Sequence, residues 1–237
     1  MGPLTRVYRN IARYAAHHGK SDLGLAMQLA ARDSSARFII RNMLTASRLA
    51  DREAMLQDAI RRVAALDGCI CEFGVYQGYT LRLLAQAAPE RRVYGFDSFE
   101  GLPEQWREGF DAGAFSTEIP RFEEPNVELV PGWFENSLPT FLQRVDTPIA
   151  LLHVDCDLYS STRTVLQYLA PRLAAGAVVV FDEYLNYPGW QQHEHRALRE
   201  AQAAGFRFEY SAYTEAGEQL MITVASPSSD PHAGNRG

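Results

Sequence analysis

The chain has 237 residues, of which 46% are hydrophobic and 22% are charged, a composition typical of globular proteins and not of disordered or fibrous ones. Its 23 basic and 29 acidic residues give a net charge of -6, which argues against a nucleic-acid partner because phosphate binding needs clustered positive charge. No stretch approaches the roughly 18 consecutive apolar residues of a membrane-spanning helix, and three cysteines do not suit a disulfide framework, so we expect a cytoplasmic protein whose partner is a small molecule.

The first 50 residues are predicted to form helices, because apolar positions recur at helical spacing over 23–31 and 38–49 without a β-rich run. We expect residues 1–50 to act as a lid or a dimer contact beside the main domain, residues 51–226. We favour a homodimer, because an apolar helical stripe with no place in the sheet needs a surface to cover it. The tail, residues 227–237, is rich in Ser, Pro, Asp and Gly and is predicted to be flexible.

From residue 51 onward, helical periodicity alternates with short apolar runs that are typical of buried strands. The expected helices are Glu53–Leu66, Tyr79–Ala88, Ser137–Arg144, Ser160–Leu173 and Gln191–Ala204. The expected strands are Cys69–Phe73, Arg92–Phe96, Val127–Val130, Ile149–Val154, Ala177–Phe181, Phe206–Tyr213 and Gln219–Ala225, the last two close enough for an antiparallel hairpin. The sequence therefore predicts an α/β fold with a doubly wound, mostly parallel seven-strand sheet and an antiparallel last strand. That order resembles the Rossmann-like sheet of class I methyltransferases.

The first strand runs into a glycine-containing loop and then into a helix, over residues 72–78. Gly74 permits a tight turn close to a ligand, and Gly78 lets the helix begin near it. A dinucleotide-binding loop needs a glycine at position 76, so the spacing argues against an NAD oxidoreductase. The E-x-G-x-x-x-G pattern resembles motif I of proteins that bind S-adenosylmethionine (SAM), in which the acid, here Glu72, helps to hold the methionine end. The alternative is a turn whose glycines only relieve steric crowding.

A second strand ends in Asp97, where a doubly wound sheet brings neighbouring strand ends together. We expect Asp97 to accept hydrogen bonds from the ribose hydroxyls, although an acid at this offset also occurs in NAD proteins and can cap the turn at residues 98–101. Trp133 follows the third strand and is expected to pack against the adenine ring. The candidate cofactor-binding residues are Glu72, Gly74, Val75, Gly78, Thr80, Asp97, Ser98, Trp133 and Asp155.

Two further strands end in pairs of acids, Asp155 with Asp157 and Asp182 with Glu183. The carboxyl ends of parallel strands meet on one rim of the sheet, so four carboxylates converge there and repel one another unless a cation joins them. Oxygen ligands suit Mg²⁺ or Mn²⁺ better than zinc. The alternative is that these acids cap the helices that follow, as Asp157 would for the helix from Ser160.

Four stretches together resemble the macrocin O-methyltransferase family, metal-dependent SAM enzymes that methylate hydroxyls of sugars or other acceptors in antibiotic biosynthesis. The stretches are Glu72–Val75 with Gly78, Gly95–Pro103, Pro131–Phe134 with Leu138 and Pro139, and Asp155–Thr162. The resemblance implies that Asp155, Asp182 and Glu183 ligate Mg²⁺, although some relatives carry Asp at the position of Glu183. It also makes Asp157 a candidate base.

The implied reaction is attack of an acceptor oxygen on the sulfonium methyl of SAM, for which the enzyme must position the hydroxyl and ease the loss of its proton. We expect Asp157 to take that proton, with His153, His193 and His195 as alternatives. His153 is expected in the core, and the other two on the surface. A phenolic acceptor and a noncatalytic SAM-binding protein are the competing functions, and the latter would need no acid cluster.

Aromatic side chains gather in two places that the fold does not explain by itself. Residues 104–125 are too long for an ordinary connection and are expected to be functional or mobile. Trp106 and Phe115 lie in that loop, and four further residues follow the last acid pair: Tyr184, Tyr187, Pro188 and Trp190. These residues either wall an acceptor pocket or make ordinary packing contacts. The three cysteines are expected to be small buried hydrophobic residues.

Overall fold

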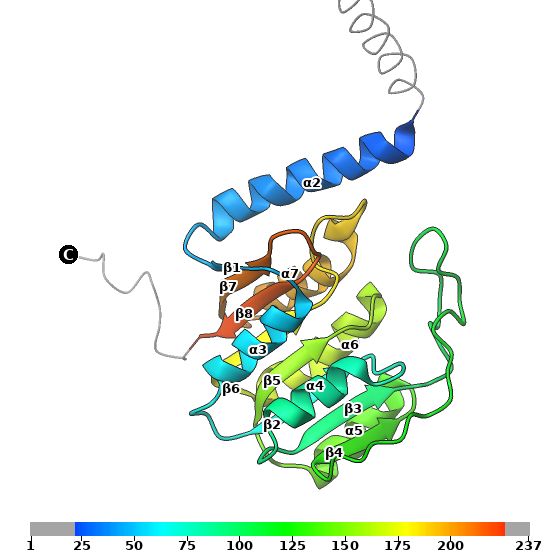
Figure 1. Cartoon of the computed structure of the whole chain (residues 1–237), viewed down its shortest axis with the longest axis vertical. Helices are drawn as coiled ribbons and strands as arrows, with labels where there is room; N and C mark the ends of the chain where they lie inside the picture. The colour runs from blue at the N-terminus through cyan, green and yellow to red at the C-terminus, as the bar shows by residue number, and fades with distance from the viewer. Residues whose placement is uncertain (1–21, 226–237) are drawn as a thin grey trace, which may run out of the picture.

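The computed structural model describes residues 22–225, which form one eight-stranded sheet with helices on both of its faces (Figure 1). The strands are β1 (Ser47–Leu49), β2 (Cys69–Phe73), β3 (Val93–Asp97), β4 (Val127–Pro131), β5 (Ile149–Val154), β6 (Leu173–Phe181), β7 (Phe208–Thr214) and β8 (Leu220–Val224). The α-helices are α2 (Leu23–Asn42), α3 (Arg52–Arg62), α4 (Tyr79–Ala87), α5 (Phe134–Arg144), α6 (Tyr159–Leu169) and α7 (Glu194–Ala203). None of these helices is both long and apolar enough to cross a membrane.

The strand order is β1-β7-β8-β6-β5-β2-β3-β4, and β8 runs antiparallel to both of its neighbours. The other pairs described are parallel, as alternating strands and helices predict. The central strands are buried over their whole length, which explains why their sequences are apolar apart from Glu72 in β2 and His153 in β5. The predicted fold class is therefore confirmed, with all seven expected strands present and β1 added at one edge.

Two hydrophobic cores lie on opposite faces of the sheet. On one face, α3 and α4 pack their apolar sides against β2, β5 and β6, with Leu56 and Leu81 fully buried. On the other face, α5, α6 and α7 cover the same strands, with Leu138, Val165 and Leu198 fully buried. The loops at the carboxyl ends of the parallel strands are thereby fixed along one edge of the sheet, where ligands bind in open α/β folds.

The segment before residue 50 differs from its prediction. The helix α2 ends at Asn42, whereas helical spacing predicts a helix up to residue 49, and Ser47–Leu49 pairs in parallel with β7 as strand β1. Backbone hydrogen bonds to an exposed sheet edge outweigh a weak helical pattern there. The predicted helix from Ser160 also ends early, at Leu169, where a short 3₁₀ turn carries Pro171. The tail, residues 227–237, and the first 21 residues lie outside the described residues.

Helix α2 is tied to the loop that follows β6. The hydroxyl of Ser35 accepts a hydrogen bond from the backbone N–H of Asn186 at 2.8 Å, and that of Ser34 accepts one from the indole N–H of Trp190 at 3.0 Å. Phe38 packs its ring against the aromatic rings that follow Glu183. One end of α2 is therefore fixed to the body of the protein, while several apolar side chains, mostly toward its N-terminus, are exposed: Leu23, Leu25, Met27, Leu29 and Ile40.

The long connection between β3 and β4 has no regular secondary structure, as expected. It is held in place by a small apolar cluster in which Leu102 and Trp106 pack against Leu158. The guanidinium of Arg107 lies 3.8 Å from the centre of the Trp106 ring and 3.2 Å from the carboxylate of Glu218 in the β7–β8 turn. The β3–β4 connection is thus held against the residues that follow β5 and against the β7–β8 turn.

Candidate active site

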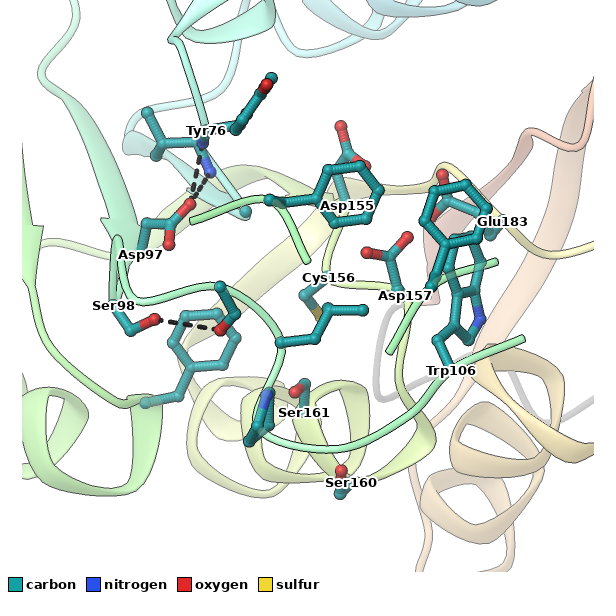
Figure 2. Close-up of a pocket in the computed structure, with 18 of the residues that line it drawn as sticks. Tyr76, Asp97, Ser98, Trp106, Asp155, Cys156, Asp157, Ser160, Ser161 and Glu183 are labelled. Atoms are coloured by element: carbon teal, nitrogen blue, oxygen red, sulfur yellow. Dashed lines mark hydrogen bonds between the residues drawn. The ribbon is translucent and has the colours of Figure 1, made fainter. Parts of the chain in front are cut away.

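A cavity of about 890 Å³ lies at the carboxyl ends of β2, β3, β5 and β6, and its volume is at the upper end for a small-molecule site (Figure 2). The sequence-predicted residues that line it are Gly74, Val75, Thr80, Asp97, Ser98, Trp133, Asp155, Asp157 and Glu183. Glu72, Gly78 and Asp182 were also predicted at the site, but they are not among the lining residues. The structure therefore joins the glycine loop and most of the acid cluster in one cavity.

The glycine loop can pass under the end of β5 only because Gly74 has no side chain. Gly74 has φ 95°, and a Cβ atom there would lie 1.7 Å from the carbonyl oxygen of Asp155. Gly78 has φ 79° and begins α4, where a Cβ atom would lie 2.4 Å from Cζ of Phe122. Gly78 thus shapes the loop without contacting the cavity. Both glycines are needed for close approach and for positive φ, as the sequence indicated.

Asp97 holds this loop through its carboxylate. Its Oδ2 accepts hydrogen bonds from the backbone N–H groups of Val75 and Tyr76, both at 2.8 Å (Figure 2). Its Oδ1 accepts one from the backbone N–H of Phe99 at 2.8 Å. Asp97 also lines the cavity, and a carboxylate can accept more hydrogen bonds than these three. Asp97 therefore connects the ends of β2 and β3 at the place predicted for the ribose.

Glu72 does not reach the cavity, in contrast to the predicted direct contact with the cofactor. Its side chain is fully buried, where Oε2 lies 2.9 Å from Nδ1 of His153 and Oε1 accepts a hydrogen bond from the hydroxyl of Thr80 at 3.2 Å. The alternation of side chains along β2 turns Glu72 toward β5 and α4. Glu72 therefore contacts Thr80, which does line the cavity, and not the cavity itself.

Asp157 occupies a strained turn directly after β5. Its φ is 62°, and the backbone N–H of Leu158 donates to the carbonyl of Cys156 at 2.6 Å, which closes a three-residue turn around it. Backbone strain of this kind is found at functional sites, and here it directs the carboxylate into the cavity. Burial raises the pKa of Asp157 to about 7, against the opposing charge of Arg107.

Carboxylate oxygens gather on the rim in two groups that share Asp155. Oxygens of Asp155, Asp157 and Glu183 lie within 4.8 Å of one another, and so do ligand atoms of Asp155, Asp182 and His153. Burial and mutual repulsion raise the pKa values of Asp155 and Glu183 well above their ordinary range. Such repulsion favours a bound cation, and hard oxygen donors suit Mg²⁺ or Mn²⁺.

Two side chains already bring positive charge to the rim. The ring of His153 is fully buried, with Nε2 3.5 Å from Oδ1 of Asp182; burial opposes its protonation, but the ion pairs with Asp182 and Glu72 raise its pKa to about 10. Nη1 of Arg52 lies 3.0 Å from Oδ2 of Asp182 and 3.6 Å from Oδ2 of Asp155. Although burial opposes it, these cations lower the pKa of Asp182. Protein groups therefore offset part of the charge of the four carboxylates, contrary to the expectation that only a cation would do so.

Arg52 is a lining residue that sequence reasoning missed. It begins α3, 130 positions before Asp182 in the chain, and no local pattern marks it.

The carboxylates of the acid rim are not fully paired by protein groups, despite Arg52 and His153. Among the described residues, Oε2 of Glu183 is buried without a hydrogen-bond partner, and Oδ1 of Asp182 has only the 3.5 Å ion-pair contact with His153. Buried acceptors of this kind are satisfied by an ion or by water, so the residues present fit a divalent cation.

The histidines divide differently from their prediction. His153 lies in the core, as expected, whereas His193 and His195 are half-buried and not on the surface. Neither of these two lines the cavity. His195 packs between Phe38 and Trp190, with ring centres 5.3 Å and 4.9 Å away. The sequence could not show this contact because Phe38 belongs to α2.

The aromatic residues fall into two sets. Trp106 and Phe115 of the long β3–β4 connection line the cavity, together with Phe110. Tyr184, Tyr187 and Trp190 are almost fully buried and belong to the core, and neither they nor Pro188 line the cavity. The second set therefore makes ordinary packing contacts. The three cysteines, Cys69, Cys71 and Cys156, are buried and free, as expected.

The sequence matches known proteins over most of the described region. Residues 31–204 match the family model of macrocin-O-methyltransferase (TylF). The chain is 30% identical over 192 residues to demethyldecarbamoylnovobiocin O-methyltransferase of Streptomyces niveus, covering 66% of this chain and 71% of that enzyme. It is 32% identical over 159 residues to 8-demethyl-8-(2,3-dimethoxy-α-L-rhamnosyl)-tetracenomycin-C 4′-O-methyltransferase of Streptomyces olivaceus, covering 54% and 58% of the two chains.

The fold matches solved structures of similar enzymes. The calicheamicin methyltransferase CalS11, a TDP-rhamnose 3′-O-methyltransferase, superimposes with a TM-score of 0.60 at 26% sequence identity, covering 72% of this chain and 77% of the other.

Proposed function

The chain belongs to the macrocin-O-methyltransferase (TylF) family of SAM-dependent O-methyltransferases, and we propose that it methylates a hydroxyl group on a sugar of a natural product. The observation that carries the proposal is the single cavity that joins the glycine loop to the acid rim. One side of it has the glycine turn and Asp97, the acid proposed to bind the ribose of SAM. The other side has carboxylates that can bind and deprotonate a hydroxyl group.

The cofactor is proposed to lie along the ends of β2, β3 and β4. The loop at Gly74 receives the methionine part, the carboxylate of Asp97 accepts hydrogen bonds from the ribose hydroxyls, and Trp133 packs against the adenine ring. The half-buried position of Trp133 at the start of α5 supports a stacking contact. Asp155 and Asp157 line the same cavity, where they would meet the acceptor oxygen beside the bound cofactor.

The acceptor is proposed to bind between the acid rim and the long β3–β4 connection. Trp106, Phe110 and Phe115 give this side of the cavity an apolar wall that fits the flat face of a sugar ring or of an aromatic aglycone. The names of the tetracenomycin and calicheamicin relatives specify rhamnose-type acceptors, which favours a sugar hydroxyl. A phenolic hydroxyl is the second candidate, because the same wall accepts an aromatic ring.

Asp157 is proposed as the base. Its carboxylate faces the cavity from the turn after β5, while the aromatic wall excludes water around the acceptor. The rim residues Asp155, Asp182 and Glu183 are proposed to hold Mg²⁺ or Mn²⁺. The buried Oε2 of Glu183, which has no hydrogen-bond partner, supports this, as does the closeness of ligand atoms of Asp155 to those of Asp182 and of Glu183. A divalent cation bound there supplies Lewis-acid stabilisation of the acceptor oxygen as its proton leaves.

The organisation of the chain is proposed from the same observations. Residues 1–50 are proposed as a lid and dimer segment, 51–226 as the methyltransferase domain and 227–237 as a flexible tail. The exposed apolar side chains of α2 support a homodimer, which light scattering at micromolar concentration tests directly. A monomeric mass would contradict it. The free, buried cysteines support a reducing compartment, and we propose the cytoplasm.

The proposed function is tested by methyl transfer from SAM carrying a deuterated methyl group. The acceptor panel contains rhamnosylated natural products, TDP-rhamnose and simple phenols, each with Mg²⁺ and with EDTA. We expect S-adenosylhomocysteine and a methylated sugar only in the Mg²⁺ arm. Methylation of the phenols alone would select the second candidate. Full activity in EDTA would reject the metal, and binding of SAM with no transfer to any acceptor would favour a noncatalytic role.

A further inference from the structure

A buried histidine links the two halves of the active site. Nδ1 of His153 lies 2.9 Å from Oε2 of Glu72, and Nε2 lies 3.5 Å from Oδ1 of Asp182. All three side chains are almost completely inaccessible to water, so the ring contacts no solvent that could replace either partner. One imidazole therefore faces a carboxylate through each of its nitrogens.

The two carboxylates belong to different parts of the site. Glu72 bonds Thr80, which lines the cavity at the start of α4, and it stands two residues before Gly74. Asp182 follows β6 directly and belongs to the acid rim. His153 lies on β5 between these strands, directly opposite Glu72 in the strand register. The bridge thus crosses three neighbouring strands beneath the cavity.

We propose that His153 is a positioning residue that fixes Glu72 under the cofactor loop and Asp182 on the cation-binding rim in one buried bridge. This inference rests on the proposed function, because it takes SAM and a divalent cation as the ligands of the two ends. Residues behind a metal ligand orient it, and their loss typically weakens cation binding by about 10-fold to 100-fold. Replacement of His153 is therefore expected to weaken both ligands together.

Comparison of an Arg52 variant with a His153 variant distinguishes a positioning role of His153 from a simple effect of its charge on cation binding. Both His153 and Arg52 place a positive group against Asp182, but Arg52 approaches from the cavity side and lines it. If positive charge alone mattered, removal of either residue would reduce repulsion and tighten cation binding. Positioning instead predicts opposite signs: tighter binding in Arg52→Gln, and weaker binding in His153→Gln.

The experiment measures Mn²⁺ affinity by electron paramagnetic resonance and SAM affinity by calorimetry, each without acceptor. We expect His153→Gln to weaken Mn²⁺ binding about 10-fold to 100-fold and SAM binding several-fold. Val178→Ala is the matched control, because Val178 is fully buried on the same face of the sheet but away from the rim. It is expected to lower the melting temperature without changing either affinity. Tighter Mn²⁺ binding in His153→Gln, or unchanged affinities in that folded variant, would overturn the proposal.

Glu72→Gln provides a second variant that keeps the shape of the bridge. It changes no cavity-lining atom, but we expect it to weaken Mn²⁺ binding at the acid rim several-fold, because Glu72 contacts Asp182 through His153. Unchanged Mn²⁺ affinity in Glu72→Gln would overturn the proposal even if His153→Gln does not fold. Failure of the parent protein to bind SAM or Mn²⁺ would instead reject the proposed function, so the two failures are distinguishable.

Discussion

The backbone of Gly74 passes so close to the end of β5 that a Cβ atom on it would lie 1.7 Å from the carbonyl oxygen of Asp155. The backbone N–H of Asp155 also donates to the carbonyl of Phe73 at 2.8 Å. The cofactor loop and the acid rim are therefore in direct backbone contact. A change in one is expected to move the other, and this contact underlies the first prediction.

Gly74→Ala is expected to lower the free energy of unfolding by about 2 kcal/mol or more and to abolish measurable SAM binding. The added methyl group meets backbone, which cannot rotate away, and φ of 95° is unfavourable for alanine. Chemical denaturation and calorimetry measure the two effects. Gly205→Ala is the control, because Gly205 has φ 108° but nothing within 4 Å of a Cβ atom. Equal losses in both variants would show that strain in φ, and not the contact, is responsible.

Asp97→Ala is expected to weaken SAM binding by about 1–3 kcal/mol, because it removes the proposed charge-assisted hydrogen bonds to the ribose. It also removes the hydrogen bonds that Asp97 accepts from the backbone N–H groups of Val75 and Tyr76 in the glycine loop. Calorimetric titration with SAM provides the measurement. Asp146→Ala, at a fully exposed aspartate, is the control and should bind SAM like the parent. Parent-like affinity in Asp97→Ala would count against the proposed ribose site.

Asp155→Asn and Asp182→Asn are expected to lower Mn²⁺ affinity and turnover together, since each removes one negative charge and one oxygen donor from the rim. In Asp182→Asn, SAM affinity should change less than about threefold, because Asp182 does not line the cavity. Turnover across a Mg²⁺ titration, with EDTA as the control, tests this. If both variants bind Mn²⁺ like the parent, and excess Mg²⁺ does not restore their turnover, then Asp155 and Asp182 are not cation ligands.

Asp157→Asn is expected to retain most of the Mn²⁺ affinity and to lose at least about 100-fold in turnover, because an amide cannot accept the proton. Turnover and Mn²⁺ binding are measured on the same preparation. Because oxygens of Asp157 lie within 4.8 Å of those of Asp155 and Glu183, the competing result is informative. Loss of Mn²⁺ affinity equal to that in Asp155→Asn would make Asp157 a cation ligand and not the base.

The free energy of unfolding of the parent is expected to fall between about pH 7 and about pH 5, and His195→Gln is expected to make this fall smaller. Burial, with the nearby charge of Arg199, lowers the pKa of His195 from 6.5 to about 4, so the unfolded chain takes up a proton first as pH falls. Because the ring is only half-buried, the difference amounts to about 1 kcal/mol. Urea denaturation of parent and variant at both pH values measures it. Identical pH dependence in the two proteins would contradict the lowered pKa.

Much of the fold could be predicted from residue periodicity alone. Buried parallel strands must be apolar on both faces, so β2 and β5 stand out as continuous runs such as Ile149–Val154. Strand β1 could not be found this way, because three residues carry too little pattern and pair only where β7 offers a free edge. The predicted end of the first helix, at residue 49, was wrong for the same reason, because β1 takes residues 47–49.

The sequence by itself determined the residues whose roles depend on their place in the chain. Gly74 follows β2 and Asp97 ends β3, and parallel strands bring such positions to one edge of the sheet. Only the tertiary structure decided which charges meet: Arg52 against Asp182, and His153 between that acid and Glu72. Glu72 and His153 are 81 positions apart along the chain, and Arg52 and Asp182 are 130 apart. These contacts depend on burial, because an unpaired buried charge is costly. Spacing in a sequence encodes position along an element, whereas pairing depends on how the elements pack.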